Sequence, residues 1–122
     1  MSVATEIPYG AYWSTPFAKW QGTLSHLHSI KFAAYVAKEE MAKRAIDPAD
    51  LDYGILGVTV PQHMSFQGLP WLTGMIGAPH VTGPTLSRVC ATGARSLENA
   101  SQEIKAGAAS VALVATCDRV SN

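Results

Sequence analysis

The sequence has few charged residues and no cluster of one sign. Lys and Arg together number nine, Asp and Glu number nine, and charged residues make up 15% of the 122 positions. Nucleic acids and anionic membranes are bound through concentrated positive charge, so the lack of a basic cluster argues against both partners. Because 48% of the residues are apolar, the chain can bury a core and is unlike a disordered protein. Its length fits one domain.

Cysteines, long apolar runs and targeting signals are scarce as well. Cys90 and Cys117 are too few for a disulfide framework, and their spacing does not match a metal site. The sequence has no run of about eighteen apolar residues, so we expect no transmembrane helix. Residues 1–10 lack the basic start and apolar stretch of a signal peptide. We therefore expect a reducing, cytoplasmic compartment and no metal.

The first half of the chain predicts a strand followed by a helix. Residues 5–13 read as a first strand, although Pro8 and Gly10 weaken it or place it near an edge. Residues 24–44 predict a helix, because apolar side chains recur at spacings of three and four and form one stripe. That stripe consists of Leu27, Ile30, Ala34, Ala37 and Met41. The pairs Glu39–Lys43 and Glu40–Arg44 have the spacing and order that stabilise a helix.

The second half predicts a parallel sheet. Residues 53–60 fit a buried strand, residues 81–89 are extended, and residues 91–106 predict a helix that Gly107 ends. Residues 110–116 form a continuous apolar run, as expected of a parallel strand covered on both faces. Strand, helix and strand in this order indicate a βαβ unit and an α/β fold.

Residues 53–87 contain no charged residue at all, but four prolines and six glycines interrupt them. One interpretation is a buried core segment with tight turns. The other is a subunit interface, where charge is depleted and large apolar side chains are enriched. Met64, Phe66, Trp71 and Met75 fit the second interpretation.

Cys90 is the one residue whose local sequence suggests chemistry. It follows an extended segment and directly precedes a helix of small residues, so its sulfur would face the unpaired amides and the positive end of the helix dipole. Both favour a thiolate nucleophile. The small Ala91 and Gly93 would let a substrate carbonyl approach the backbone, where the Cys90 amide could help bind an oxyanion. The alternative is a small, unreactive buried cysteine.

Segment 87–93, SRVCATG, resembles the nucleophile segment of the thiolases, which make or cleave β-ketoacyl-CoA. Residues 15–24 (TPFAKWQGTL) resemble that family's early TPFGK-type loop, and residues 47–58 (DPADLDYGILGV) are similar to the stretch leading into its second strand. Residues 106–122 (AGAASVALVATCDRVSN) resemble the segment after its nucleophile helix. The matches are collinear over nearly the whole chain. They imply that residues 1–122 form a thiolase-like N-terminal half-domain, with a mixed, mainly parallel sheet and helices packed on it.

The resemblance also implies a mechanism. Cys90 would take an acyl group from a coenzyme A thioester, and the enolate of a second acyl-CoA would attack it in a Claisen condensation, with thiolysis as the reverse. Coenzyme A thioesters would be substrates, with no tightly bound cofactor. Departures from the family pattern leave substrate choice open. They are Ser87 in place of the usual Asn, Ala91-Thr92 in place of Gly/Ala-Ser, Thr116-Cys117 in place of Gly-Gly, Asp118 in place of Glu, and Ser14 in place of Arg.

The family's later motifs are absent from this sequence: its Gly-His-Pro loop, its Asn-containing motif and its Cys-x-Gly-Gly-Gly motif. Cys117 lacks the context of that second cysteine, so the role is not transferred to it. The four histidines match no family motif and are expected to be polar surface or loop residues; they are His26, His28, His63 and His80. Since carbon–carbon bond formation needs a base, we expect the chain alone to be nearly inactive. It would need a polypeptide that supplies the rest of the fold, in a homo- or hetero-oligomer.

Two other interpretations stay open. A β-ketoacyl synthase often carries Cys-Ala-Thr-Gly at its nucleophile too, but would use an acyl carrier protein; residues 15–24 favour a thiolase over it. A non-catalytic thiolase-like subunit would stabilise a partner or bind an acyl ligand, and the departures at Ser87, Thr116 and Cys117 are compatible with that role.

Overall fold

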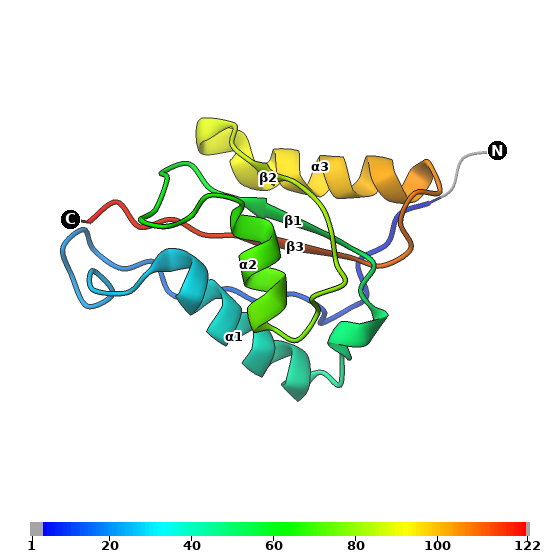
Figure 1. Cartoon of the computed structure of the whole chain (residues 1–122), viewed down its shortest axis with the longest axis horizontal. Helices are drawn as coiled ribbons and strands as arrows, with labels where there is room; N and C mark the ends of the chain where they lie inside the picture. The colour runs from blue at the N-terminus through cyan, green and yellow to red at the C-terminus, as the bar shows by residue number, and fades with distance from the viewer. Residues whose placement is uncertain (1–3, 122) are drawn as a thin grey trace.

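The computed structural model describes residues 4–121 and shows an α/β fold in three layers. A parallel three-stranded sheet in the order β2-β1-β3 lies between helices α1 and α2 on one face and helix α3 on the other (Figure 1). The elements are α1 (Ser29–Lys43), the 3₁₀ turn η1 (Pro48–Asp50), β1 (Tyr53–Gly57), α2 (Gly68–Met75), β2 (Thr85–Leu86), the 3₁₀ turn η2 (Val89–Ala91), α3 (Thr92–Lys105) and β3 (Ala112–Thr116). The parallel strands and the helix between β2 and β3 confirm the α/β prediction.

Helix α1 begins later than the apolar stripe predicts. Residues 24–27 form turns, and the extended His28 is the N-cap, its ring accepting a hydrogen bond from the Ile30 amide at 3.2 Å. The four helical residues of the stripe are all buried: Ile30, Ala34, Ala37 and Met41. They pack against Leu56 of β1 and Leu113 of β3, so this face of the sheet holds the larger core.

Helix α2 is an element that the sequence analysis does not predict. It lies in the uncharged stretch 53–87 and buries Leu69, Leu72 and Thr73 against the same core. The stretch therefore contains core, as the first interpretation requires. Phe66 and Met64, in the loop before α2, are 92% and 77% exposed and remain candidates for an interface.

The opposite face of the sheet is covered by α3 at close range. A Cβ built on Gly57 of β1 would lie 2.7 Å from both Ser96 Oγ and Thr92 Cγ2, so only glycine lets the first turns of α3 approach the strand this closely. Helix α3 ends at Lys105, and Gly107 follows with φ +79°, in the left-handed conformation that the sequence predicts for a helix end.

The prediction of a first strand at residues 5–13 is wrong. Pro8 to Ala11 form a tight turn in which the Ala11 amide donates to the Pro8 carbonyl at 2.9 Å, and Gly10 has φ +82°. A glycine with positive φ at this position is typical of a type II turn, which interrupts an extended segment. No residue of 4–13 pairs with the sheet.

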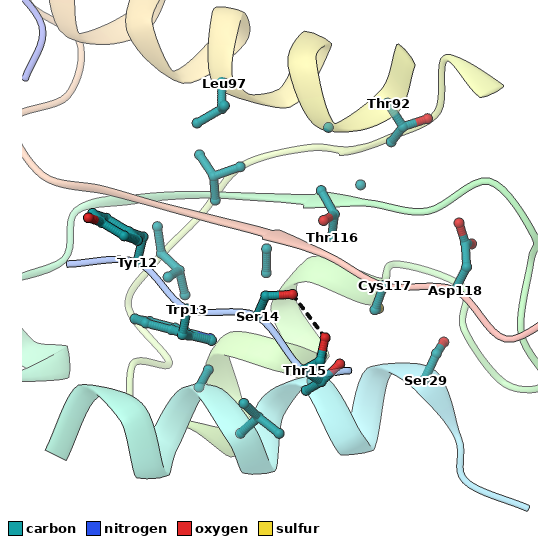
Figure 2. A pocket seen from close by; sticks show the side chains of 18 of the residues that line it. Tyr12, Trp13, Ser14, Thr15, Ser29, Thr92, Leu97, Thr116, Cys117 and Asp118 are labelled. Atoms are coloured by element: carbon teal, nitrogen blue, oxygen red, sulfur yellow. Dashed lines mark hydrogen bonds between the residues drawn. The ribbon is translucent and has the colours of Figure 1, made fainter. Parts of the chain in front are cut away.

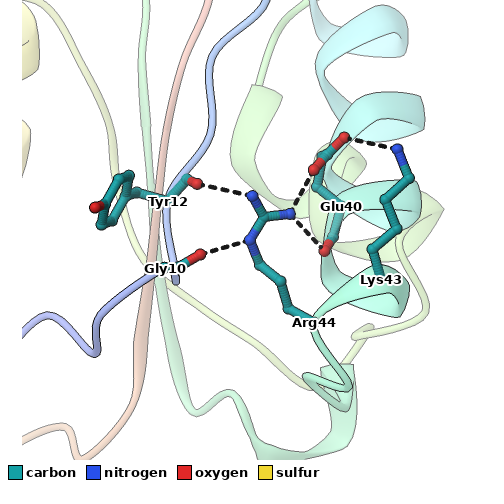
Figure 3. Close-up of polar contacts among 5 residues, drawn as sticks. All are labelled: Gly10, Tyr12, Glu40, Lys43 and Arg44. Carbon is teal, nitrogen blue, oxygen red and sulfur yellow. Dashed lines mark hydrogen bonds and ion pairs between the residues drawn. The ribbon is translucent and has the colours of Figure 1, made fainter.

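Arg44 fastens this N-terminal segment to α1 instead. Its guanidinium donates to the carbonyls of Gly10 at 2.6 Å and Tyr12 at 3.0 Å (Figure 3). It also pairs with Glu40, as the helix spacing predicts, whereas Lys43 pairs with Glu40 rather than with Glu39. Hydrogen bonds from Arg44 and then Lys43 lower the pKa of Glu40.

Candidate active site

Cys90 lies in the one-turn helix η2, between the end of β2 and the start of α3, and its side chain is exposed. The predicted extended segment before it contains a short strand, Thr85–Leu86, and then turns sharply. A thiol on such a turn is open to a substrate from outside the sheet. It is not one of the buried cysteines that pack as small apolar side chains.

The turn that carries Cys90 is strained and braced. Val89 has φ +51°, a left-handed conformation that β-branched residues rarely adopt. Thr92 holds this turn with one hydroxyl: Oγ accepts from the Arg88 amide at 2.8 Å and donates to the Val89 carbonyl at 2.7 Å. Thr92 is itself buried against β1 at Gly57, so its side chain fixes the turn relative to the sheet.

The beginning of α3 beside Cys90 is open. Ala91, the N-cap, offers no side-chain acceptor to the first amides of the helix, and a Cβ added at Gly93 would meet nothing within 4 Å. Amides at a helix N-terminus and the positive end of its dipole favour a negative charge placed there. This geometry can bind an oxyanion formed on an acyl group attached to Cys90.

A large open cavity of about 1700 Å³ runs from Cys90 along the molecule. Its walls are residues 5–20, the inner side of α1, strand β3 and the side of α3 (Figure 2). Ligand pockets for small molecules are usually about 300–1000 Å³. This cavity is larger than such a pocket, and one of its walls is the edge of a sheet.

Cys117 lies in this cavity and differs from Cys90 in its surroundings. It follows β3, is partly buried and sits beside Ser29 at the start of α1 (Figure 2). The pKa of Cys117 is raised to about 11, chiefly by burial; a hydrogen bond with Ser29 lowers it in part, and the charge of Asp118 adds to the rise. A thiol with this pKa is a poor nucleophile at neutral pH.

The histidines lie away from Cys90, in structural roles or at the surface. His28 caps α1, donates through Nε2 to the His63 carbonyl at 2.6 Å, and packs edge-on against Trp71. His80 hydrogen-bonds to the Leu51 carbonyl at 2.8 Å. Within residues 4–121, no group of three or more His, Cys, Asp or Glu side chains is arranged to hold a metal ion. None of the helices described is long and apolar enough to cross a membrane.

The family described as "Thiolase, N-terminal domain" matches residues 11–122, which is almost the whole chain. This chain belongs to the thiolase family. By sequence it is 26% identical over 110 residues to acetyl-CoA acetyltransferase IA of Candida tropicalis, a match covering 88% of this chain and 27% of that protein. Family membership confirms the resemblance found in the sequence.

Solved thiolases and a related synthase share this fold. Human mitochondrial 3-ketoacyl-CoA thiolase superposes with a TM-score of 0.74 at 24% identity, covering 80% of this chain and 25% of the human one. The same human enzyme in complex with CoA superposes with a TM-score of 0.72. The 3-oxoacyl-[acyl-carrier-protein] synthase III of Aquifex aeolicus gives 0.66 at 23% identity, covering 84% and 32%. The chain therefore spans about a quarter to a third of these proteins.

The thiolase-like fold is an α/β fold, as the sequence predicts, and the sheet is wholly parallel within residues 4–121. Sequence reasoning singles out Cys90 but misses the residues that hold its turn, namely Val89, Thr92 and Gly57. A signal for Thr92 was available, because a threonine at the start of a helix commonly bonds to nearby backbone groups. Nothing in the sequence marks the left-handed conformation of Val89.

Proposed function

We propose that this chain carries the acyl-accepting cysteine of a thiolase-type acyltransferase that uses coenzyme A thioesters. One observation supports this most directly: in a chain of the thiolase family, an exposed thiol lies on a braced turn at the open start of a helix. The complex of the human relative with CoA is consistent with a coenzyme A thioester as the acyl donor.

The first half-reaction needs only groups near Cys90. The Cys90 thiolate attacks the thioester carbonyl, the new carbon–sulfur bond forms, and the bond to the sulfur of coenzyme A breaks. Coenzyme A leaves as a thiolate and takes up a proton. Backbone amides at the start of α3 would stabilise the negative oxygen of the intermediate.

The second half-reaction needs groups that residues 4–121 do not place beside Cys90. Forming the enolate of a second acyl-CoA requires a base, and the histidines described have structural roles or lie at the surface. A further polypeptide would supply the base and the proton shuttle. Alone, the chain would be acylated slowly and would form no carbon–carbon bond.

Acetylation by radiolabelled acetyl-CoA, followed by peptide mass spectrometry, tests this function. Label is expected on Cys90, and Cys90→Ser should remove it, whereas the matched change Cys117→Ser should leave it. Label on Cys117 instead, or none on Cys90 in the assembled protein, would contradict the proposal. Unchanged activity of the assembly with Cys90→Ala would favour a non-catalytic subunit.

A β-ketoacyl synthase is the second candidate, because the Aquifex aeolicus synthase shares the fold with a TM-score of 0.66. The two functions differ in the acyl donor. Equal concentrations of acetyl-CoA and acetyl-acyl carrier protein should be offered in parallel. Faster labelling of Cys90 by acetyl-CoA supports a thiolase, and faster labelling by the carrier protein supports a synthase.

A further inference from the structure

Three side chains converge on Gly57, the last residue of β1. A Cβ built on this glycine would lie 2.7 Å from Ser96 Oγ, 2.7 Å from Thr92 Cγ2 and 3.0 Å from Thr116 Cγ2. Thr92 and Ser96 come from the first turns of α3, and Thr116 ends β3 on the side of the sheet that faces α3 (Figure 2). The start of α3 therefore packs directly on the Gly57 backbone, and a larger residue there would push these groups away.

Ser96 links this contact to the backbone of α3. Its side chain is fully buried, and its hydroxyl donates to the Thr92 carbonyl at 2.7 Å. A serine that bonds to the carbonyl four residues earlier usually destabilises or bends a helix slightly, and alanine is the better helix former. The helix as such therefore gains little from this hydroxyl. What the hydroxyl does is hold the peptide group of Thr92 beside the sheet.

Thr92 connects these contacts to the turn that carries the candidate nucleophile. Its carbonyl accepts from Ser96, and its methyl group faces Gly57. Its hydroxyl bonds to the Arg88 amide at 2.8 Å and to the Val89 carbonyl at 2.7 Å. The carbonyl, the methyl group and the hydroxyl of one residue thus contact the helix, the sheet and the turn. A shift of the helix start on the sheet would move the turn with it.

We propose that Ser96 and Gly57 are positioning residues for acyl transfer at Cys90, and that they act through Thr92. This rests on the proposed function, in which the Cys90 thiolate attacks a thioester carbonyl beside the amides at the start of α3. A displacement of reacting groups by about 1 Å can slow such a step about a hundredfold. Because Ser96 is fully buried, it acts without touching the substrate. Loss of its hydroxyl should therefore slow acylation without weakening the binding of acetyl-CoA.

Ser96→Ala is the first test, because it removes one hydroxyl and adds no atom. The variant is made in the native protein, together with any polypeptide that associates with it. The rate constant for acetylation of Cys90 at saturating acetyl-CoA should fall about fivefold, as expected for the loss of one hydrogen bond. The acetyl-CoA concentration that gives half the maximal rate should stay unchanged. A purely structural role would lower the fraction of protein that is labelled and leave the rate constant as it is.

Gly57→Ala should slow acetylation more, up to about a hundredfold, because its methyl group displaces the start of α3. Adding Thr92→Ser to this variant removes the methyl group that lies 2.7 Å away and keeps the hydroxyl, so the double variant should react faster than Gly57→Ala alone. The matched control is Gly74→Ala in α2, where an added Cβ meets nothing within 4 Å and the native rate constant is expected. Should Gly57→Ala not fold, Ser96→Ala decides the question.

Alkylation of Cys90 by iodoacetamide separates this proposal from the proposed function, because alkylation needs no acyl transfer. Ser96→Ala and Gly57→Ala should both slow it. Slower alkylation in these variants, with no acetylation even of the native protein, would refute the function and support the positioning role. Acetylation of the native protein, with native rate constants for acetylation and alkylation in Ser96→Ala, would support the function and overturn the positioning role.

Discussion

Strands β1 and β3 have equal length and lie in parallel register, yet their surroundings differ. Strand β1 has a neighbour on each edge and helices on each face, and Ile55 and Leu56 are fully buried. Within residues 4–121, strand β3 pairs along one edge only, and its Val114 and Ala115 are partly buried. The comparison shows a fold that is closed around β1 and open beside β3. The turn that carries Cys90 is anchored to β1 through Thr92, which packs at Gly57, whereas Cys117 follows β3.

The largest difference between the two strands should appear in the stability lost when one side chain on each is truncated. Leu56→Ala should lower the free energy of unfolding by about 3 kcal/mol, because it leaves a cavity in a closed core. Val114→Ala should cost about 1 kcal/mol or less, since solvent already reaches that side chain. Urea unfolding of both variants measures this. Equal losses would show that β3 is as well packed as β1.

The two cysteines should differ strongly in alkylation. A pKa of about 11, two above the ordinary 9.0, leaves Cys117 about a hundredfold less thiolate at pH 8 than an unperturbed thiol would have. Iodoacetamide at pH 8 should therefore label Cys90 and spare Cys117. The Cys90→Ala variant isolates Cys117, whose labelling should rise steeply as the pH approaches 11. Comparable rates for both thiols at pH 8 would contradict this contrast.

The same shift has a consequence for stability. The pKa of Cys117 is higher in the folded chain than in the unfolded one. Its protonated thiol therefore adds to the free energy of unfolding, and this contribution is present in full below pH 9. It is lost as the pH rises from about 9 to 11. Thermal unfolding across this range should show a fall in midpoint that Cys117→Ala reduces. An identical fall in that variant would assign the effect to other groups.

Removing the hydroxyl that braces the Cys90 turn should have a smaller effect on stability than truncating Leu56. Thr92→Val keeps the shape but removes the hydroxyl that bonds to Arg88 and Val89, so it should cost about 1–2 kcal/mol. It should also slow alkylation of Cys90, because the turn is no longer fixed. Thr92→Ser retains the hydroxyl, so it should preserve both the stability of the chain and the rate of Cys90 alkylation. A Thr92→Val chain with native alkylation kinetics would show that the brace does not position the thiol.

The sequence predicts the segments that have a regular pattern of apolar residues. It does not predict the segments whose structure depends on contacts with distant parts of the chain. The stripe of α1 has strong periodicity and β3 is a continuous apolar run, so the sequence predicts both elements. It does not predict helix α2, because Gly68, Pro70 and Gly74 give turn signals that burial of Leu69 and Leu72 overrides. Residues 5–13 read as a strand by composition, but the turn at Gly10 and the lack of a pairing neighbour keep them out of the sheet.

For the candidate site, sequence alone identified Cys90 and its place before a helix. It could not identify the conformation of Val89 or the contact of Thr92 with Gly57, since both depend on how the helix meets a strand more than thirty positions away in the chain. The role of Cys90 in acyl transfer stays a prediction until it is labelled.

Two aspartates hold β1 and β3 together at opposite ends. Asp52 accepts from the Ser110 and Val111 amides before β3, and Asp118 accepts from the Thr59 and Val60 amides after β1. A slip by one position would turn every side chain of β3 to the wrong face and break both clamps. The two aspartates thus leave β3 a single alignment on β1, so the place of Cys117 beyond the end of β3 is settled by the same contacts.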